Sequence, residues 1–140
     1  MNGRYAGDVS SPEAWEMLER DPQAVLIDVR TEPEWRFVGV PDPSGIERRT
    51  VCVSWQVYPG LHLNPDFVEQ VAAGGVAPEQ TLLLICRSGQ RSRQAAVALT
   101  ARGYSRCYNV SDGFEGGHDE DRHRGTREGW KRAGLPWRQE

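Results

Sequence analysis

Short apolar runs alternate with segments of helical periodicity along the chain. Residues 81–85 form a continuous, mostly apolar run bounded by turn-forming residues, which is typical of a central parallel strand covered on both faces. Residues 50–55 alternate apolar and polar positions and are rich in β-branched side chains, which also favours a strand. The pattern predicts five strands in all, at residues 5–9, 24–29, 50–55, 81–85 and 106–110.

Helical segments separate these strands. Ser11 is expected to cap the first helix, because Pro12 fits the first helical position and Glu13 complements the helix dipole. Further helices are predicted to begin near Thr31 and to span residues 64–73, 91–102 and 127–133. The order of strands and helices predicts an α/β fold with a largely parallel sheet. The 140 residues are expected to form one domain, spanning residues 1–140.

Composition narrows the class of protein. Hydrophobic residues make up 38% and charged residues 26% of the chain, as in a globular domain. No apolar stretch approaches the roughly 20 residues that a membrane span needs, and the first residues do not resemble a signal peptide, so we expect a cytoplasmic protein without a membrane partner. The net charge of −3 argues against binding to nucleic acid. Three widely spaced cysteines do not suggest a disulfide framework.

The candidate chemistry lies directly after the run at 81–85. Cys86 stands at the carboxyl end of this strand, where ligands of open α/β sheets bind, and a helix begins shortly after it. The unpaired N–H groups of that helix, with Arg87 and Arg91 if they turn inward, would stabilise a thiolate. Gly89 permits a sharp turn whose N–H groups converge on an anion. We therefore predict a nucleophilic cysteine under an oxyanion cradle, rather than an inert buried thiol.

Other residues near this loop have competing interpretations. Ser92 either contacts the thiolate or caps the helix, and the cap is the favoured interpretation. Asp28 and Arg30 end the second strand on the side of the loop, where we expect them to support the fold or orient the loop. The aromatic residues Trp35, Trp55, Phe114 and Trp130 either line the mouth of a pocket or pack in the core.

Three sequence motifs resemble those of the single-domain rhodaneses, the thiosulfate sulfurtransferases. The stretch CRSGQRS at residues 86–92 resembles their active-site loop, LIDVRTEPEW at residues 26–35 resembles their first signature, and residues 113–117 and 129–137 resemble their C-terminal signature. In place of the common Gly-His-Ile-Pro-Gly-Ala segment this chain has VGVPDP at residues 38–43, which leaves the local turn there in question.

The resemblance implies both a fold and a reaction. It implies a five-stranded, mainly parallel sheet flanked by helices on both faces. It also implies that Cys86 takes the outer sulfur of thiosulfate as a persulfide and passes it to cyanide or a thiol, without a cofactor. The loop residues Arg87, Ser88, Gly89, Gln90, Arg91 and Ser92 would bind the substrate. Arg87, directly after the cysteine, favours thiosulfate over mercaptopyruvate as the donor.

Other functions remain open at this point. A persulfide carrier fed by a sulfur-relay protein partner would use the same residues. A cysteine-dependent phosphatase or an arsenate reductase relative is disfavoured, because phosphatases of this architecture have five residues between cysteine and arginine and this chain has four between Cys86 and Arg91. A metal site is not expected, since His118, His123, Cys52 and Cys107 match no zinc-binding spacing. The charged segment at residues 118–128 has no assigned role.

Overall fold

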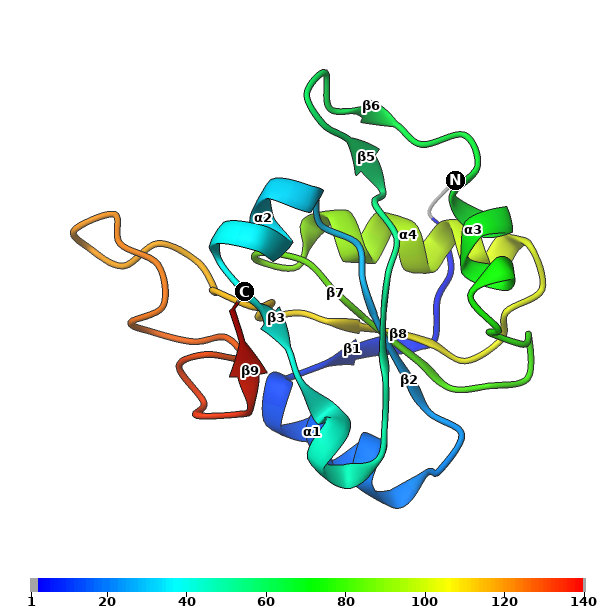
Figure 1. Cartoon of the computed structure of the whole chain (residues 1–140), viewed down its shortest axis with the longest axis horizontal. Coiled ribbons are helices and arrows are strands. Elements are labelled where there is room, and N and C mark those ends of the chain that lie inside the picture. The colour runs from blue at the N-terminus through cyan, green and yellow to red at the C-terminus, as the bar shows by residue number, and fades with distance from the viewer. Residues whose placement is uncertain (1–2, 140) are drawn as a thin grey trace.

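A five-stranded parallel sheet forms the centre of the molecule in the computed structural model, which describes residues 3–139. Figure 1 shows the strands fanning across the middle of the chain. Their order across the sheet is β1 (Gly7–Val9), β8 (Cys107–Val110), β7 (Leu82–Ile85), β2 (Val25–Asp28) and β4 (Thr50–Cys52), and every neighbouring pair is parallel. The predicted α/β fold with a mainly parallel sheet is confirmed.

The two central strands are buried on both faces, which explains their continuous apolar sequences. In β7, Leu82 and Leu84 pack on one side of the sheet, while Leu83 and Ile85 pack on the other. Side chains of a strand alternate between the two faces, so each strand contributes to two separate hydrophobic clusters. The candidate Cys86 belongs to the same cluster as Leu82 and Leu84.

Helices cover both faces of the sheet, as Figure 1 shows. Helices α3 (Phe67–Ala73) and α4 (Gln90–Ala101) pack over the face of Leu82 and Leu84. Helix α1 (Ser11–Arg20) covers the opposite face, together with the buried rings of Phe114 and Trp130. The short helices α2 (Glu32–Phe37) and η1 (Pro43–Ile46) follow β2 and precede β4.

The cap of the first helix lies one residue earlier than predicted, and the helix itself begins at Ser11. Ser10, not Ser11, is the N-cap: its hydroxyl accepts a hydrogen bond from the Glu13 amide, and the Glu13 carboxylate accepts one from the Ser10 amide. This reciprocal pair is a capping box. Ser11 lies within the first turn instead, and its hydroxyl contacts the Asp112 carboxylate at 2.9 Å.

The predicted helix at residues 127–133 is wrong, because this segment consists of turns. The Trp130 amide donates to the carbonyl of Gly113, and the Lys131 amide donates to the carbonyl of Phe114. Gly129 and Gly134 also have positive φ angles of 109° and 77°. The amides of Trp130 and Lys131 therefore bond to the glycine-rich loop after β8, and local bonds such as that from the Ala133 amide to the Gly129 carbonyl close turns without forming a helix.

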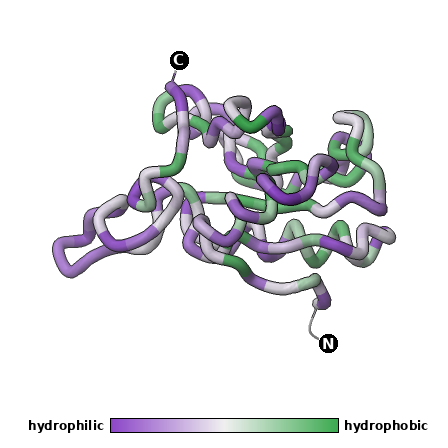
Figure 2. The backbone as a smooth tube through the Cα atoms, turned by 90° about the horizontal axis from the view of Figure 1, so that it is seen from below, coloured by the Kyte–Doolittle hydropathy of each residue, from purple (hydrophilic) through white to green (hydrophobic). Residues whose placement is uncertain are grey.

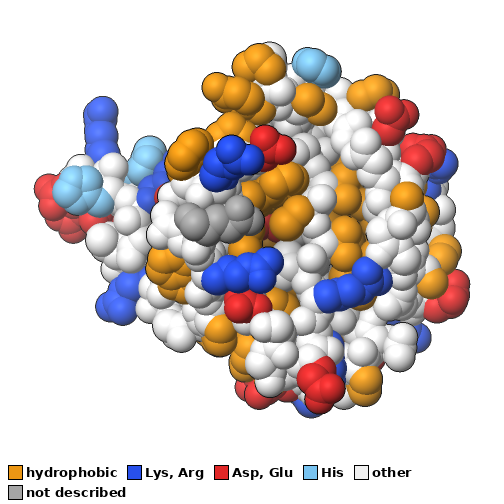
Figure 3. Space-filling view, viewed as in Figure 1, with side chains coloured by type: hydrophobic (Ala, Val, Ile, Leu, Met, Phe, Trp, Pro, Cys, Tyr) orange, Lys and Arg blue, Asp and Glu red, His pale blue; other side chains and the backbone are white. Residues whose placement is uncertain are grey.

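Two small antiparallel pairs lie outside the main sheet. Strand β3 (Val40–Pro41) pairs with β9 (Trp137–Arg138), and β5 (Gln56–Val57) pairs with β6 (His62–Leu63). The predicted strand at 50–55 ends at Cys52, after which the chain leads into the β5–β6 hairpin. Figure 3 shows hydrophobic side chains gathered over this hairpin, where Tyr58, Leu61 and Leu63 are each at least half exposed.

Residues 118–128 form a polar arm that projects from the body of the molecule, as Figure 2 shows. Asp119 organises the arm, because its carboxylate accepts hydrogen bonds from the amides of Asp121 and His123 and from the Thr126 hydroxyl. Across the part of the chain that the structure describes, helices are too short or too polar to cross a bilayer.

The central position of β7 leads to a testable prediction. We expect Leu84→Ala to lower the free energy of unfolding by about 3 kcal/mol, since it leaves a cavity in a fully buried site. Leu63→Ala removes the same atoms from a side chain that is 57% exposed and should change it by less than about 0.5 kcal/mol. Urea unfolding of both variants measures the difference, and equal losses would contradict the burial pattern.

Candidate active site

The sulfur of Cys86 lies directly beyond the carboxyl end of β7. Only 1% of this residue is exposed. Its carbonyl accepts a 2.8 Å hydrogen bond from the Phe114 amide, which joins the cysteine to the glycine-rich loop after β8. The position agrees with the general location of sites in open α/β sheets.

The chain turns back on the Cys86 sulfur at Gly89. This glycine has a φ of 104°, and its amide donates a 3.1 Å hydrogen bond to Cys86 Sγ. A Cβ at this position would collide with the backbone of Ser111, so the turn needs glycine for both conformation and space. Gly89 is also the N-cap of α4, which places the start of this helix beside the sulfur.

Ser92 does not cap the helix, contrary to the favoured sequence interpretation. It lies inside the first turn of α4 and is fully buried. Its Oγ is 3.2 Å from Cys86 Sγ and 2.6 Å from Asn109 Oδ1. The less favoured alternative, a contact with the cysteine, is the one that the structure contains.

The other loop residues are more exposed than Gly89 and Ser92. Ser88 is half-buried, and Arg87 and Gln90 are exposed. The Arg87 carbonyl accepts hydrogen bonds from the amides of Glu115 and Gly116, so the backbone of the loop is held firmly. Within residues 3–139, the Arg87 guanidinium has no ion-pair partner, so its charge is available to a ligand.

Arg91 turns toward Glu34 of α2. Its Nη1 and Nη2 donate to the two oxygens of the Glu34 carboxylate, at 2.7 and 3.0 Å. The same carboxylate accepts hydrogen bonds from the amide and hydroxyl of Thr31. Burial by itself would raise the pKa of Glu34, but the hydrogen bonds and charge of Arg91, with those of Thr31, outweigh it and lower the pKa to about 2.

Asp28 and Arg30 form a second ion pair, at the end of β2. Both side chains are fully buried, and Arg30 Nη2 donates to Asp28 Oδ2 at 2.7 Å. Arg30 also donates to the Gly39 carbonyl and lies over the ring of Phe114, with 4.4 Å from its Cζ to the ring centroid. These contacts connect β2 to the loop that holds Cys86, which agrees with a supporting role.

The other two cysteines are poor nucleophiles. Desolvation, with the charge of Asp28, raises the pKa of Cys52 to about 12. Burial raises the pKa of Cys107 to about 11. Both therefore remain protonated near neutral pH. Among residues 3–139, no three His, Cys, Asp or Glu side chains gather as a metal site would require.

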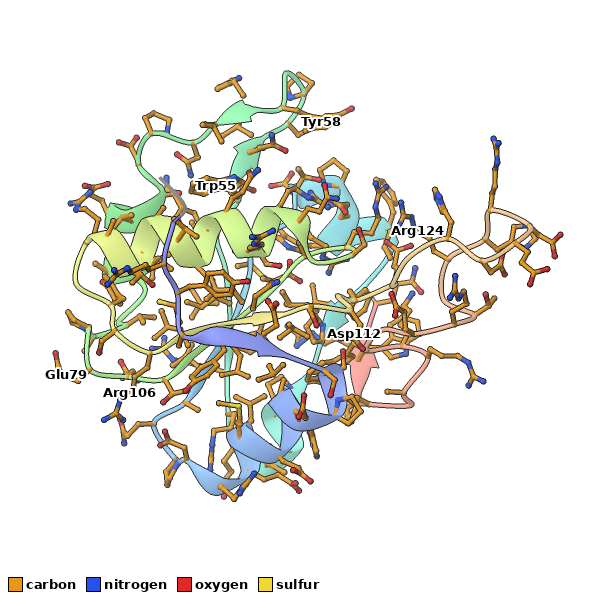
Figure 4. The ribbon with its side chains drawn as sticks, turned by 180° about the vertical axis from the view of Figure 1, so that it is seen from behind. Trp55, Tyr58, Glu79, Arg106, Asp112 and Arg124 are labelled. Carbon is orange, nitrogen blue, oxygen red and sulfur yellow. The ribbon has the colours of Figure 1, made fainter. Side chains whose placement is uncertain are left out.

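Two cavities flank the loop that follows Cys86. One, of about 320 Å³, is lined by Arg87 and Arg91, by Thr31 and by the β5–β6 hairpin, including Tyr58 and Leu61. Figure 4 shows Tyr58 on this hairpin and Trp55 close to α4, where its Nε1 donates to Gln94.

The second cavity lies on the β1 and β8 side of the loop and has about 530 Å³. It is lined by Asp8, Asn109, Ser88, Gly89 and Gln90, among other residues. The aromatic residues divide between the two sequence alternatives: Phe114 and Trp130 are fully buried in the core, whereas Trp35 and Trp55 are half-buried.

The sequence analysis missed two residues of this site. Glu34 binds Arg91 across 57 positions of the chain, which spacing alone does not reveal. Asn109 contacts Ser92, and a polar residue inside an otherwise buried strand was the one available signal.

A family model for the STR4 middle domain matches residues 6–140 of the chain. The chain belongs to this rhodanese-like family. A crystal structure of Rv0390 from M. tuberculosis is 47% identical, with a TM-score of 0.89 over 98% of this chain and 100% of that chain.

Curated relatives extend this rhodanese-like group. The protein RC0915 of Rickettsia conorii is 37% identical over 93% of this chain and 95% of its own length. A thiosulfate sulfurtransferase GlpE of Actinobacillus pleuropneumoniae is 26% identical over 92% of this chain and 90% of its own length. Together with the family match, these similarities identify a rhodanese-like domain.

The ion pair of Glu34 with Arg91 generates a prediction about stability. A carboxylate whose pKa is lowered on folding contributes stability above its unfolded value near 4.5, and loses it as the pH falls toward 2. We expect Glu34→Gln to lower the free energy of unfolding by about 2 kcal/mol at pH 7. The difference from the parent protein should shrink between pH 4.5 and pH 2.

Urea unfolding of both proteins across this pH range measures the effect. Glu69→Gln is the matched control, because Glu69 also pairs with an arginine, Arg102, but both side chains are more than half exposed. Glu69→Gln should lower the free energy of unfolding much less than Glu34→Gln does. A Glu34→Gln deficit that does not change with pH would contradict the ionic origin of this stability.

Proposed function

We propose that this protein transfers the outer sulfur of thiosulfate to cyanide or a thiol through a persulfide on Cys86. The observation that carries the proposal is the hydrogen bond from the Gly89 amide to the Cys86 sulfur, at the start of α4. A helix N-terminus and an inward-facing amide favour negative charge at this atom. The resemblance of residues 86–92 to the rhodanese active-site loop, and the GlpE relative, support the same assignment.

The reaction divides into two displacements at sulfur. The Cys86 thiolate attacks the outer sulfur of thiosulfate, a new S–S bond forms, and the S–S bond of thiosulfate breaks with its electron pair leaving on sulfite. Cyanide or a thiolate then attacks the outer sulfur of the persulfide. The S–S bond of the persulfide breaks with its electron pair remaining on Cys86 Sγ as a thiolate, and thiocyanate or a new persulfide leaves. No external oxidant or reductant enters either step.

The loop residues have different roles in binding the anion. Arg87 carries the free positive charge and attracts the sulfite end of thiosulfate from the 320 Å³ cavity. Arg91, neutralised by Glu34, lies on the wall of the same cavity and holds α2 against the loop. Ser88, Gly89 and Gln90 supply backbone amides around the transferred sulfur.

The assignment of Cys86 is tested directly by substitution. Cys86→Ser should abolish sulfite release from thiosulfate, because a hydroxyl cannot form a persulfide, while the unfolding midpoint stays close to that of the parent. Cys52→Ser is the matched control and should retain activity, since Cys52 lies on the edge strand β4, separated from β7 by β2, and is protonated at neutral pH. Sulfite release is measured with cyanide as acceptor.

Two results would contradict this assignment. The first is sulfite release by Cys86→Ser at the parent rate. The second is hydrolysis of aryl phosphates by the parent protein at a rate comparable with its sulfur transfer, which would favour a phosphatase.

The role of Arg87 generates a separate prediction. Arg87→Ala should raise the KM for thiosulfate about tenfold, because it removes a charge-assisted interaction with a dianion. Arg93→Ala is the matched control: Arg93 is also an exposed arginine, but it lines the cavity on the opposite side of the loop. Steady-state kinetics at fixed ionic strength measure both. Equal effects of the two substitutions would show that only the overall charge matters.

A further inference from the structure

Asn109 lies behind the candidate active site and makes three side-chain hydrogen bonds. It is 2% exposed and belongs to β8. Its Nδ2 is 3.0 Å from the Asp8 carboxylate and 3.1 Å from the Gly89 carbonyl. Its Oδ1 is 2.6 Å from Ser92 Oγ, which in turn lies 3.2 Å from Cys86 Sγ. A continuous chain of contacts therefore joins β1 to the sulfur.

The partners of Asn109 determine the direction of every hydrogen bond in this chain. The Asp8 carboxylate and the Gly89 carbonyl only accept, so they require the amide nitrogen of Asn109 on their side. The amide oxygen must then face Ser92, and it can only accept. The Ser92 hydroxyl has one hydrogen, so when that hydrogen is donated to Asn109, its lone pairs face Cys86.

We infer that Asn109 is a positioning residue that controls the protonation of Cys86 through Ser92. In the resting arrangement, the Cys86 thiol donates to Ser92, and Ser92 donates to Asn109. When Cys86 loses its proton, Ser92 can stabilise the thiolate only by turning its hydroxyl away from Asn109, which leaves a buried amide oxygen unpaired. Asn109 thereby favours the protonated cysteine and opposes the contribution of the Gly89 amide.

Charged groups on the neighbouring elements also influence the Cys86 sulfur. A test of Asn109 must therefore leave these charges unchanged. Arg87 lies in the loop itself, and Arg91 of α4 is paired with Glu34 of α2. Asp28 and Arg30 form a neutral pair at the end of β2. Asp8 of β1 lies behind Asn109. A substitution at Asn109 changes none of these charges, so its effect on Cys86 must pass through hydrogen bonds.

The site tolerates a smaller side chain at position 109. Asn109 is 2% exposed but borders the 530 Å³ cavity together with Asp8 and Ser111, so water can enter the space that the amide vacates only in the Asn109→Ala variant. Water is free to rotate and does not force the Ser92 hydroxyl in one direction. Asn109→Ala therefore removes the acceptor that holds Ser92, and Asn109→Ser is a second variant with a milder change in polarity.

The test measures how fast iodoacetamide alkylates Cys86 as a function of pH, by the mass of the Cys86 peptide. We expect Asn109→Ala to move the midpoint of this profile down by about one pH unit, since the freed hydroxyl can donate to the thiolate. Asn109→Ser should move it in the same direction. In a Ser92→Ala background, Asn109→Ala should leave the midpoint unchanged. Digestion with two proteases, which cleave after arginine and after glutamate, separates the three cysteines: Glu69 and Glu79 lie between Cys52 and Cys86, and Arg87 lies between Cys86 and Cys107.

The outcomes separate this inference from the proposed function on which it rests. A profile that does not move in either Asn109 variant, or that moves equally with and without Ser92, overturns the role of Asn109. Thermal unfolding of each Asn109 and Ser92 variant shows whether that variant is folded under the conditions of the alkylation experiment. Alkylation requires no sulfur donor, so the result stands even if thiosulfate is not the substrate.

Discussion

The site depends on one contact, the hydrogen bond from the Gly89 amide to the Cys86 sulfur. To make it, the chain must leave β7 and reverse direction within three residues, with Gly89 at a φ that other residues rarely adopt. The reversal also brings the start of α4 to the sulfur. The inward-facing amide on the Cys86 sulfur and the nearby start of α4 are therefore consequences of a single turn.

The surrounding structure holds this turn in place from several sides. The glycine-rich loop after β8 donates amides to the carbonyls of Cys86 and Arg87, and its Gly113 packs so closely that a Cβ would collide with the Arg87 carbonyl. Asp112 fastens the same loop to the first turn of α1 through Ser11 and to the C-terminal segment through the Gly129 amide. Figure 4 shows Asp112 beside the C-terminal segment.

Two ion pairs complete the support of the turn. Asp28 and Arg30 are fully buried, so each would be costly without the other. Arg30 also packs on the ring of Phe114, and the Phe114 amide donates to the Cys86 carbonyl. The buried ion pair is therefore connected to the glycine-rich loop that supports Cys86. Glu34 and Arg91 join α2 to α4 at the wall of the 320 Å³ cavity.

The sequence predicted the sheet and the cysteine loop because both depend on local patterns. The apolar run of β7 and the glycine at position 89 each determine the local structure within a few residues. The predicted helix at 127–133 is wrong because the amides of Trp130 and Lys131 bond to Gly113 and Phe114, which lie far away in the chain. For the same reason, the Glu34 partner of Arg91 and the Asn109 partner of Ser92 could not be found from spacing. Sequence patterns report short-range geometry, whereas the site is completed by contacts between distant elements.

The mass of the intact protein after incubation with thiosulfate tests the central claim most directly. The account predicts a gain of one sulfur atom, located on the peptide that contains Cys86 and removed by cyanide with release of thiocyanate. A protein that gains no sulfur under these conditions, or that carries it on Cys52 or Cys107, would contradict the account.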